Sequence, residues 1–269
     1  MGFILKLLNI FFSVFLINLP VFGATISGNV RQDEILNNKN VVIDSMTEKP
    51  VKGADIFVPN YNIQTKTDSL GRFELNADIT DKAILQIKKE GYRPFSITID
   101  KSINDNPLRL GIQKTNSSDI YIDSNVYHLG DDVYSSNSAN CNQFKVKPIG
   151  PFYSKIISIP KPDINKQAVI VFGSVIGLDT KLAKELGQNA ILSVYSSPLE
   201  IIFNGQKIGE LNMNGDNQQI IIPNILLKPK NELIIRTGKN LFQHKYIDYD
   251  DMEFANLRIE FQEKIFANR

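Results

Sequence analysis

The chain has 269 residues, a formal net charge of +1 and a pI near 7.7. The balanced charge excludes a broad electrostatic field that would attract nucleic acid or anionic lipid, and the single cysteine, Cys141, excludes an intrachain disulfide. This length is enough for two ordinary domains or for one large β-sandwich.

The N-terminal segment has the pattern of a secretory signal. One cation at Lys6 precedes an apolar run that ends at Leu19, and the small residue Gly23 follows. We therefore expect residues 1–23 to be a signal peptide, and the remaining chain to be secreted, periplasmic or on the cell surface. An uncleaved membrane anchor is the alternative, because the apolar run is long and one lysine is a weak charged region. After signal removal the sequence contains no run long enough for a membrane span.

Short β-rich runs alternate with turns in residues 41–99. At one turn, Gly71 supplies the positive φ that a tight reversal needs, and Asp68 can accept backbone N–H bonds within it. The alternation predicts a compact antiparallel sandwich. The expected strands cover residues 41–44, 54–58, 64–67, 72–75, 83–88 and 95–99.

The same stretch carries an ordered set of short motifs. They are Asp44-Ser45 with Lys49-Pro50-Val51, Gly53-Ala54-Asp55-Ile56, Thr67-Asp68 with Gly71-Arg72-Phe73, and Glu90-Gly91-Tyr92. In this order they resemble the carboxypeptidase regulatory-like domain, a small prealbumin-like β-sandwich. The resemblance implies a structural spacer or presentation module without peptidase activity. The sequence contains no paired His and Glu at the spacing of zinc ligands.

A polar stretch follows at residues 100–119 and ends in a run rich in Ser and Asn, the composition of a domain boundary. Alternating apolar residues around Leu110 allow one more strand of the first domain, so we place the boundary near Lys114. The expected organisation is a first domain over residues 24–113, a linker over 114–119 and a second domain over 120–269.

Residues 199–238 contain the clearest fold signal, four short apolar runs separated by turn residues. Asn204-Gly205 suits a type I′ hairpin turn, because both central residues must tolerate positive φ. None of the runs is followed by the long helical segment that a parallel crossover needs, so an antiparallel sandwich is expected. Further strands are expected at 155–159, 168–172 and within 246–261, with a bulge near Ala255-Asn256 and a short helix at 178–186.

Several motifs of the second half resemble galactose-binding-like jelly-roll domains, the fold of many carbohydrate-binding modules. They are HLGDD at 128–132, NQF at 142–144, FNGQKIGEL at 203–211, NGDNQQIIIP at 214–223, LLKPKNELIIRTG at 226–238 and DYDDMEFANLRIEF at 248–261. The expected fold class is therefore all-β, with two antiparallel β-sandwiches, the first small and prealbumin-like and the second a jelly roll. The fold does not identify the ligand, since it also serves lipid, nucleic-acid and protein recognition.

The resemblance also implies a structural calcium near the last strand. The candidate ligands Asp248, Asp250, Asp251 and Glu253 supply the hard oxygen atoms that calcium requires. The alternative is a solvated acidic turn before a strand. No other cofactor is expected.

Sugar binding needs an aromatic ring against the apolar face of a pyranose, together with carboxylates and amides for its hydroxyl groups. Two predicted loops carry such residues, and we expect them to lie together at one end of the second sandwich. The absence of Trp weakens the stacking interaction, and each ring taken alone could belong to the core. The candidates are Tyr127, Asp131, Asp132 and Tyr134 in one loop, and Phe242, Tyr246 and Tyr249 in the other.

Catalysis is not expected. His128 and His244 are the only histidines, and the sequence contains no nucleophile elbow, P-loop or dinucleotide fingerprint. We therefore predict an exported, non-catalytic binding protein that recognises a carbohydrate or surface polymer through its second domain. The alternative is a structural or assembly component of a cell-surface or envelope complex, with another exported protein as its partner. Nucleic acid is not an expected partner.

Overall fold

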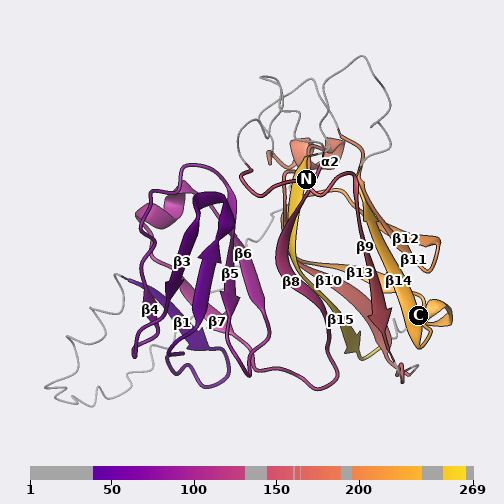
Figure 1. Cartoon of the computed structure of the whole chain (residues 1–269), viewed down its shortest axis with the longest axis horizontal. Coiled ribbons are helices and arrows are strands. Elements are labelled where there is room, and N and C mark those ends of the chain that lie inside the picture. Colours follow the sequence, from indigo (N-terminus) through magenta and orange to yellow (C-terminus); the bar gives the residue numbers. More distant parts are fainter. Residues whose placement is uncertain are drawn as a thin grey trace, which may run out of the picture.

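A computed structural model describes residues 39–130, 144–159, 161–163, 165–188, 196–237 and 251–264. They form two β-sandwiches that lie side by side, with one short α-helix, α2 (Lys181–Glu185), in the described residues (Figure 1). The expected all-β fold class is thus confirmed. None of the helices in these residues is long and apolar enough to cross a membrane. The expected signal peptide lies outside them and stays a prediction.

The first sandwich consists of two sheets with the strand orders β4-β1-β7 and β3-β2-β5-β6. Their inner faces enclose a core of aliphatic residues that includes Ile56, Leu85 and Ile87. One pairing, β1 with β7, is parallel, whereas we expected antiparallel pairing throughout. The strands are β1 (Asn40–Asp44), β2 (Asp55–Val58), β3 (Ile63–Lys66), β4 (Arg72–Phe73), β5 (Ala83–Lys88), β6 (Phe95–Ile99) and β7 (Arg109–Ile112), with the 3-10 turns η1 (Pro59–Tyr61) and η2 (Lys101–Asn104).

The turn before β4 forms as its residues predict. Gly71 has a φ of 71°. The Asp68 carboxylate accepts backbone N–H bonds from Leu70 and Arg72, each over 2.8 Å. These bonds lie within the turn and close the reversal, and the backbone N–H of Val42 in β1 donates to the carbonyl oxygen of Gly71 over 2.8 Å.

In its described residues the second sandwich has eight strands in two antiparallel sheets, with the orders β13-β10-β15-β8 and β12-β11-β14-β9. This interleaving of early and late strands between two four-stranded sheets is the jelly roll that the motifs indicated. The strands are β8 (Ile120–Leu129), β9 (Phe152–Ser158), β10 (Gln167–Ile176), β11 (Leu199–Phe203), β12 (Gln206–Leu211), β13 (Gly215–Ile222), β14 (Lys230–Arg236) and β15 (Met252–Gln262), with the 3-10 turn η3 (Asn224–Leu226).

Strand β15 contains the predicted bulge. Asn256 has a φ of 54°, and the register with β8 shifts between Ala255 and Leu257. The shift brings Phe254 and Leu257 into the same hydrophobic core although they have opposite parity in the sequence.

Strand β10 is buried on both faces. Ile170 and Phe172 point into the core of the jelly roll, whereas Val169 and Val171 belong to the opposite face and are also buried. That opposite face is covered because β6 of the first sandwich packs against β10. The sheet β13-β10-β15-β8 is therefore the layer on which the first sandwich rests.

Polar contacts tie the two sandwiches together around a small apolar cluster. The Ser174 hydroxyl donates to the Ser96 hydroxyl over 3.0 Å, and the backbone N–H of Thr98 donates to the Asp216 carboxylate over 2.9 Å. The apolar cluster consists of Ile84, Phe144, Ile176 and Ala255.

Close approach of the sandwiches requires a glycine in β10. A Cβ atom at Gly173 would lie 2.5 Å from Oγ of Ser96 and 2.7 Å from Cβ of Asn256. Any side chain here would therefore push β6 away from β10.

Candidate functional site

The two loops predicted to bind sugar leave the second sandwich at adjacent points. Leu129 pairs with Met252 across β8 and β15, and a Cβ atom at Gly130 would lie 2.0 Å from Oδ1 of Asp251. The described residues on either side of the loops thus lie at one end of the sheet. Of the predicted ligand-binding residues only Tyr127 is described. The others, which stay predictions, are Asp131, Asp132, Tyr134, Phe242, Tyr246 and Tyr249.

Tyr127 corrects one expectation, because it lies inside β8 and not in a loop. Its ring stacks on Phe254 with ring centroids 5.6 Å apart, and it contacts Tyr153 at 4.8 Å. Its hydroxyl donates to Oδ2 of Asp123 over 2.7 Å. Packed in this way, the half-buried ring supports the core of the second sandwich.

Asp251, one of the expected calcium ligands, pairs with a buried histidine. Nε2 of His128 lies 2.8 Å from Oδ1 of Asp251, and Nδ1 lies 2.7 Å from the carbonyl oxygen of Val146. Burial acts to lower the pKa of His128, but the bonds to Asp251 and Val146 outweigh it and raise that pKa above its ordinary value. An imidazolium that donates from both nitrogens fits this geometry.

Glu253, another expected calcium ligand, links the two sandwiches. Nδ2 of Asn60, in η1 of the first sandwich, donates to Oε2 of Glu253 over 2.8 Å. Oδ1 of Asn60 accepts the backbone N–H of Lys145 over 2.7 Å. Glu253 is fully buried, and this burial raises its pKa to about 7, although the Asn60 bond acts in the opposite direction.

The described residues alone do not fit a calcium site. Asp251 faces His128, and Glu253 faces Asn60, so each carboxylate already has a protein partner. Within the described ranges no three His, Cys, Asp or Glu side chains gather closely enough to hold a metal ion. Asp248 and Asp250 lie outside those ranges.

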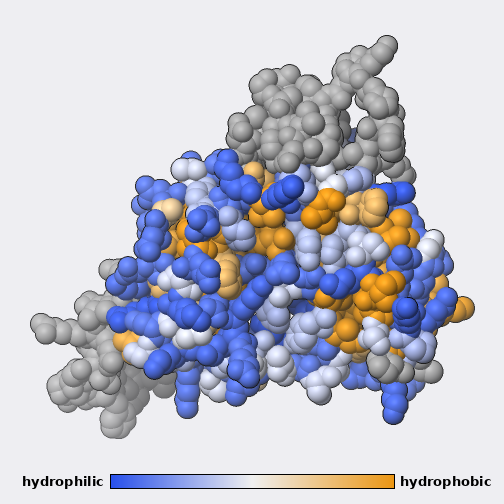
Figure 2. Space-filling model, viewed as in Figure 1, coloured by the Kyte–Doolittle hydropathy of each residue, from blue (hydrophilic) through white to orange (hydrophobic). Residues whose placement is uncertain are grey.

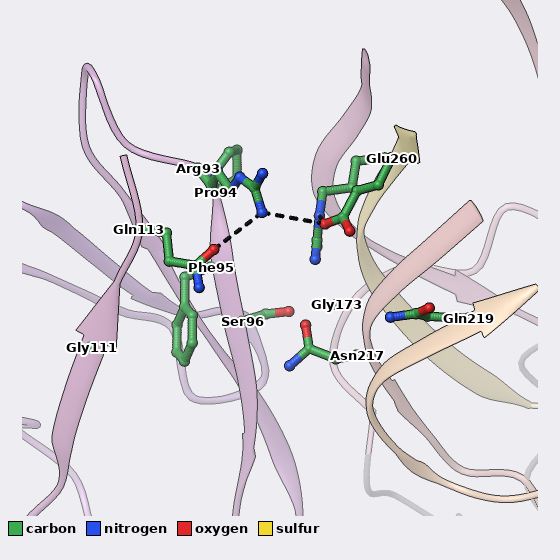
Figure 3. Close-up of a pocket in the computed structure, with 11 residues that line it drawn as sticks. Arg93, Pro94, Phe95, Ser96, Gly111, Gln113, Gly173, Asn217, Gln219 and Glu260 are labelled. Atoms are coloured by element: carbon green, nitrogen blue, oxygen red, sulfur yellow. Dashed lines mark hydrogen bonds and ion pairs between the residues drawn. The ribbon is translucent and has the colours of Figure 1, made fainter. Parts of the chain in front are cut away.

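A cleft of about 330 Å³ opens between the two sandwiches, where β6 and β7 of the first face β10, β13 and β15 of the second (Figure 3). This volume is near the lower end of the range for small-molecule sites, about 300–1,000 Å³. The lining residues are Arg93, Pro94, Phe95, Ser96, Gly111, Gln113, Gly173, Asn217, Gln219, Arg258 and Glu260.

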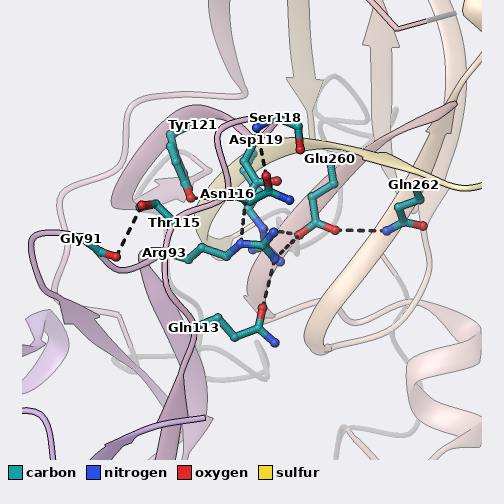
Figure 4. A network of polar contacts seen from close by, with 11 residues as sticks. Gly91, Arg93, Gln113, Thr115, Asn116, Ser118, Asp119, Tyr121, Glu260 and Gln262 are labelled. Atoms are coloured by element: carbon teal, nitrogen blue, oxygen red, sulfur yellow. Dashed lines mark hydrogen bonds and ion pairs between the residues drawn. The ribbon is translucent and has the colours of Figure 1, made fainter. Parts of the chain in front are cut away.

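Arg93 lines the cleft and bridges the two sandwiches through polar contacts (Figure 4). Its Nε lies 2.6 Å from Oδ2 of Asp119, and its Nη1 lies 3.1 Å from Oε1 of Gln113 and 3.5 Å from Oε1 of Glu260. The Asp119 side chain is only 2% exposed. Burial raises the pKa of Asp119, while the charge of Arg93 opposes the rise.

Glu260 is held by donors from its own strand. Nε of Arg258 donates to its Oε1 over 2.7 Å, and Nε2 of Gln262 donates to its Oε2 over 3.1 Å. Burial acts to raise the pKa of Glu260, but these bonds outweigh it and hold the pKa below the ordinary value. Glu260 therefore remains a carboxylate at neutral pH.

The cleft residues were not among the sites predicted from the sequence. One signal was available, because Arg258, Glu260 and Gln262 alternate with apolar residues and so share the outer face of β15. Nothing local in the sequence indicated that this face meets Arg93.

Comparisons with known proteins agree with part of this description. Residues 40–124 match the family model of the CarboxypepD_reg-like domain, which confirms the resemblance inferred from the motifs. The match ends inside β8, and the expected domain boundaries stay predictions. No curated protein matches the chain.

Among solved structures, the chain is similar to a carbohydrate-binding module, CBM36, in complex with calcium and xylotriose. The identity is 10%, and the similarity covers 54% of this chain and 98% of that one, with a TM-score of 0.26. A similarity this low identifies neither a ligand nor a metal for this chain.

Proposed function

We propose that this chain is an exported, non-catalytic protein that recognises a carbohydrate or a surface polymer with its second sandwich. The observation that supports this most is the cleft, where β10, β13 and β15 of the second sandwich form one wall and residues of the first sandwich, such as Gln113, complete the site. Amides, guanidinium groups and a hydroxyl line it, and such groups pair with sugar hydroxyls. Phe95 is the one aromatic residue among the lining residues, and its ring also packs against the core of the first sandwich.

The charges in the cleft favour binding over hydrolysis. Glu260 is the one acidic residue among those that line it. Both of its oxygens already accept hydrogen bonds, from Arg258 and Gln262. Glycoside hydrolysis by the usual route needs two carboxyl groups across the scissile bond. A single, fully engaged carboxylate supports a binding site.

A glycan array tests the proposal. The purified chain is expected to bind a subset of the glycans, and Gln113→Ala is expected to weaken that binding because the variant removes a lining amide. Gln206→Ala, an exposed change on β12, serves as the control and is expected to bind as the parent does. If the folded protein binds no glycan, the proposal is wrong.

Calcium belongs to the same proposal, with Asp248, Asp250, Asp251 and Glu253 as its candidate ligands. Thermal unfolding with calcium and with a chelator tests it. A bound ion is expected to raise the Tm in a concentration-dependent way, because it binds only the folded state. An unchanged Tm up to millimolar calcium would exclude the ion.

A second candidate function, contact with another exported protein, is favoured by the outer face of β12-β11-β14-β9. Phe152 and Ile156 on β9 are each 55% exposed and share that face. Figure 2 shows hydrophobic surface over the side of the second sandwich where Figure 1 draws β9 and β14. Exposed apolar residues grouped in this way indicate a partner.

Crosslinking of the protein in its native envelope tests the second function. Ile156→Lys is expected to abolish a crosslinked partner, whereas Ser154→Lys adds the same charge on the same face without removing an apolar side chain. Equal crosslinking of parent and Ile156→Lys would contradict a role for this face.

A further inference from the structure

Most of the hydrogen-bond acceptors in the cleft are already occupied by protein donors. The Glu260 carboxylate accepts from Arg93, Arg258 and Gln262. The side-chain oxygen of Gln113 accepts from Arg93, and that of Gln219 accepts from Gln262 over 3.2 Å. The Asn217 amide is the remaining side chain with an uncommitted oxygen in the cleft.

Among the side-chain groups of the cleft that do not bond to protein, hydrogen-bond donors outnumber acceptors. Within the described ranges, Nη2 of Arg93 and both terminal nitrogens of Arg258 make no hydrogen bond to protein. The same holds for the side-chain NH₂ groups of Gln113 and Gln219. The ligand that complements this surface must therefore be rich in acceptors.

The charges of the lining residues also favour a ligand that is rich in acceptors and negatively charged. Arg93 and Arg258 are cationic, and Glu260 is the one anion among the residues that line the cleft. Asp119 also pairs with Arg93, but its side chain is only 2% exposed and it is not among the lining residues, whereas Arg93 is 20% exposed and lines the cleft. A guanidinium group has a planar fork of donors that matches a carboxylate.

We propose that the cleft takes an acidic saccharide, a sugar unit whose carboxylate pairs with the guanidinium groups of Arg93 and Arg258. This inference rests on the proposed function. The amides of Gln113, Asn217 and Gln219 bind the hydroxyl groups of the same unit. A cleft of about 330 Å³ has room for the sugar ring as well as the carboxylate.

Calorimetric titration with a matched pair of probes tests this inference. Methyl glucuronide and methyl glucoside differ in the carboxylate that replaces a hydroxymethyl group. The full chain is expected to bind the glucuronide at least about tenfold more tightly at low salt, since bonds to charged groups are the stronger ones. Added salt is expected to reduce that ratio.

Two substitutions at Arg258 test whether its guanidinium group causes the preference for the glucuronide. Arg258→Gln is expected to bring the glucuronide-to-glucoside ratio close to one, and Arg258→Lys is expected to recover part of it, because the charge returns without the fork. Arg109→Gln, an exposed change on β7, is the matched control and keeps the parental ratio. Thermal unfolding of each variant shows whether the fold is intact.

The other possible outcomes contradict either the acidic-ligand inference alone or the proposed carbohydrate function as well. Equal affinity for the two probes refutes the acidic-ligand inference and leaves the carbohydrate function standing. Acetate that binds as tightly as the glucuronide shows an anion site that does not recognise sugar. If a folded protein binds neither sugar, here or on the glycan array, both the inference and the proposed function are wrong.

Discussion

Two clusters of polar side chains join the sandwiches, and they differ in how much water reaches them. In the first, His128, Asp251 and Glu253 are fully buried, and Asn60 nearly so. In the second, the cleft, Arg93 keeps 20% of its side chain exposed. Water cannot replace a lost partner in the first cluster, whereas it can in the second. We therefore expect the buried cluster to stabilise the fold and the cleft to remain available for a ligand.

The largest effect is expected from Asp251→Ala. This change leaves the buried His128 imidazolium without its carboxylate, and such a loss typically costs about 3–5 kcal/mol. Urea denaturation with a chelator present measures the free energy of unfolding without any contribution from calcium. Asp78→Ala, at an exposed position, is the control. A loss below about 1 kcal/mol would show that the pair is not ionised or not buried in solution.

Glu253→Gln is expected to change the pH dependence of stability. The pKa of Glu253 is about 7 in the fold against an ordinary value of 4.5. The folded state therefore keeps a proton that the unfolded state loses, so this group reduces stability progressively as the pH rises from about 4.5 to 7. The variant removes that slope and is expected to be about 1–3 kcal/mol more stable at pH 8.

His128 contributes a slope of the same sign at higher pH. Its folded pKa is raised, so its stabilising contribution is complete below about pH 6.5 and is lost as the pH rises through the folded pKa. The Glu253→Gln variant should therefore keep a residual decrease above neutrality. If the parent and the variant have identical stability profiles from pH 4.5 to 8, the Glu253 carboxyl is not buried as described.

A moderate effect is expected from Gly173→Ala, in β10 where the two sandwiches approach closely. The added methyl group would overlap Ser96 and Asn256, and overpacking of this kind costs about 1–3 kcal/mol. Ser96→Gly in the same chain removes one of the two overlaps and should restore part of the stability. Denaturant melts of the single and double variants measure this. No rescue would indicate that the sandwiches are not packed at this point.

The smallest effect is expected in the cleft. A double-mutant cycle with Arg93→Gln and Glu260→Gln measures the coupling between the two side chains, which lie 3.5 Å apart. Since both reach solvent, we expect about 0.2–1 kcal/mol. A coupling of about 3–5 kcal/mol, the size expected for the buried His128–Asp251 pair, would mean that the cleft is as strongly coupled as the buried cluster. That result would favour a structural role for the cleft.

The sequence predicted two members of the buried cluster but not their partners. An acidic motif marked Asp251 and Glu253 as candidate calcium ligands, an assignment that stays a prediction. The donor that meets Glu253 is Asn60, 193 residues away in the other sandwich. Tyr127 was misplaced for a related reason, since an aromatic residue next to polar residues resembles a loop until its packing against Phe254 is known.

Turns, strands and the bulge follow from local sterics and side-chain alternation. Asn204 and Gly205 adopt φ values of 51° and 80°, and Asn256 adopts 54°, because few residue types tolerate such angles and the chain has them where a reversal or a phase shift is needed. Tertiary structure decided which outer face of the jelly roll is covered and which residues form the cleft. Arg93 and Glu260 are 167 residues apart, and no periodicity relates them. Only the packing of one sandwich on the other brings them together.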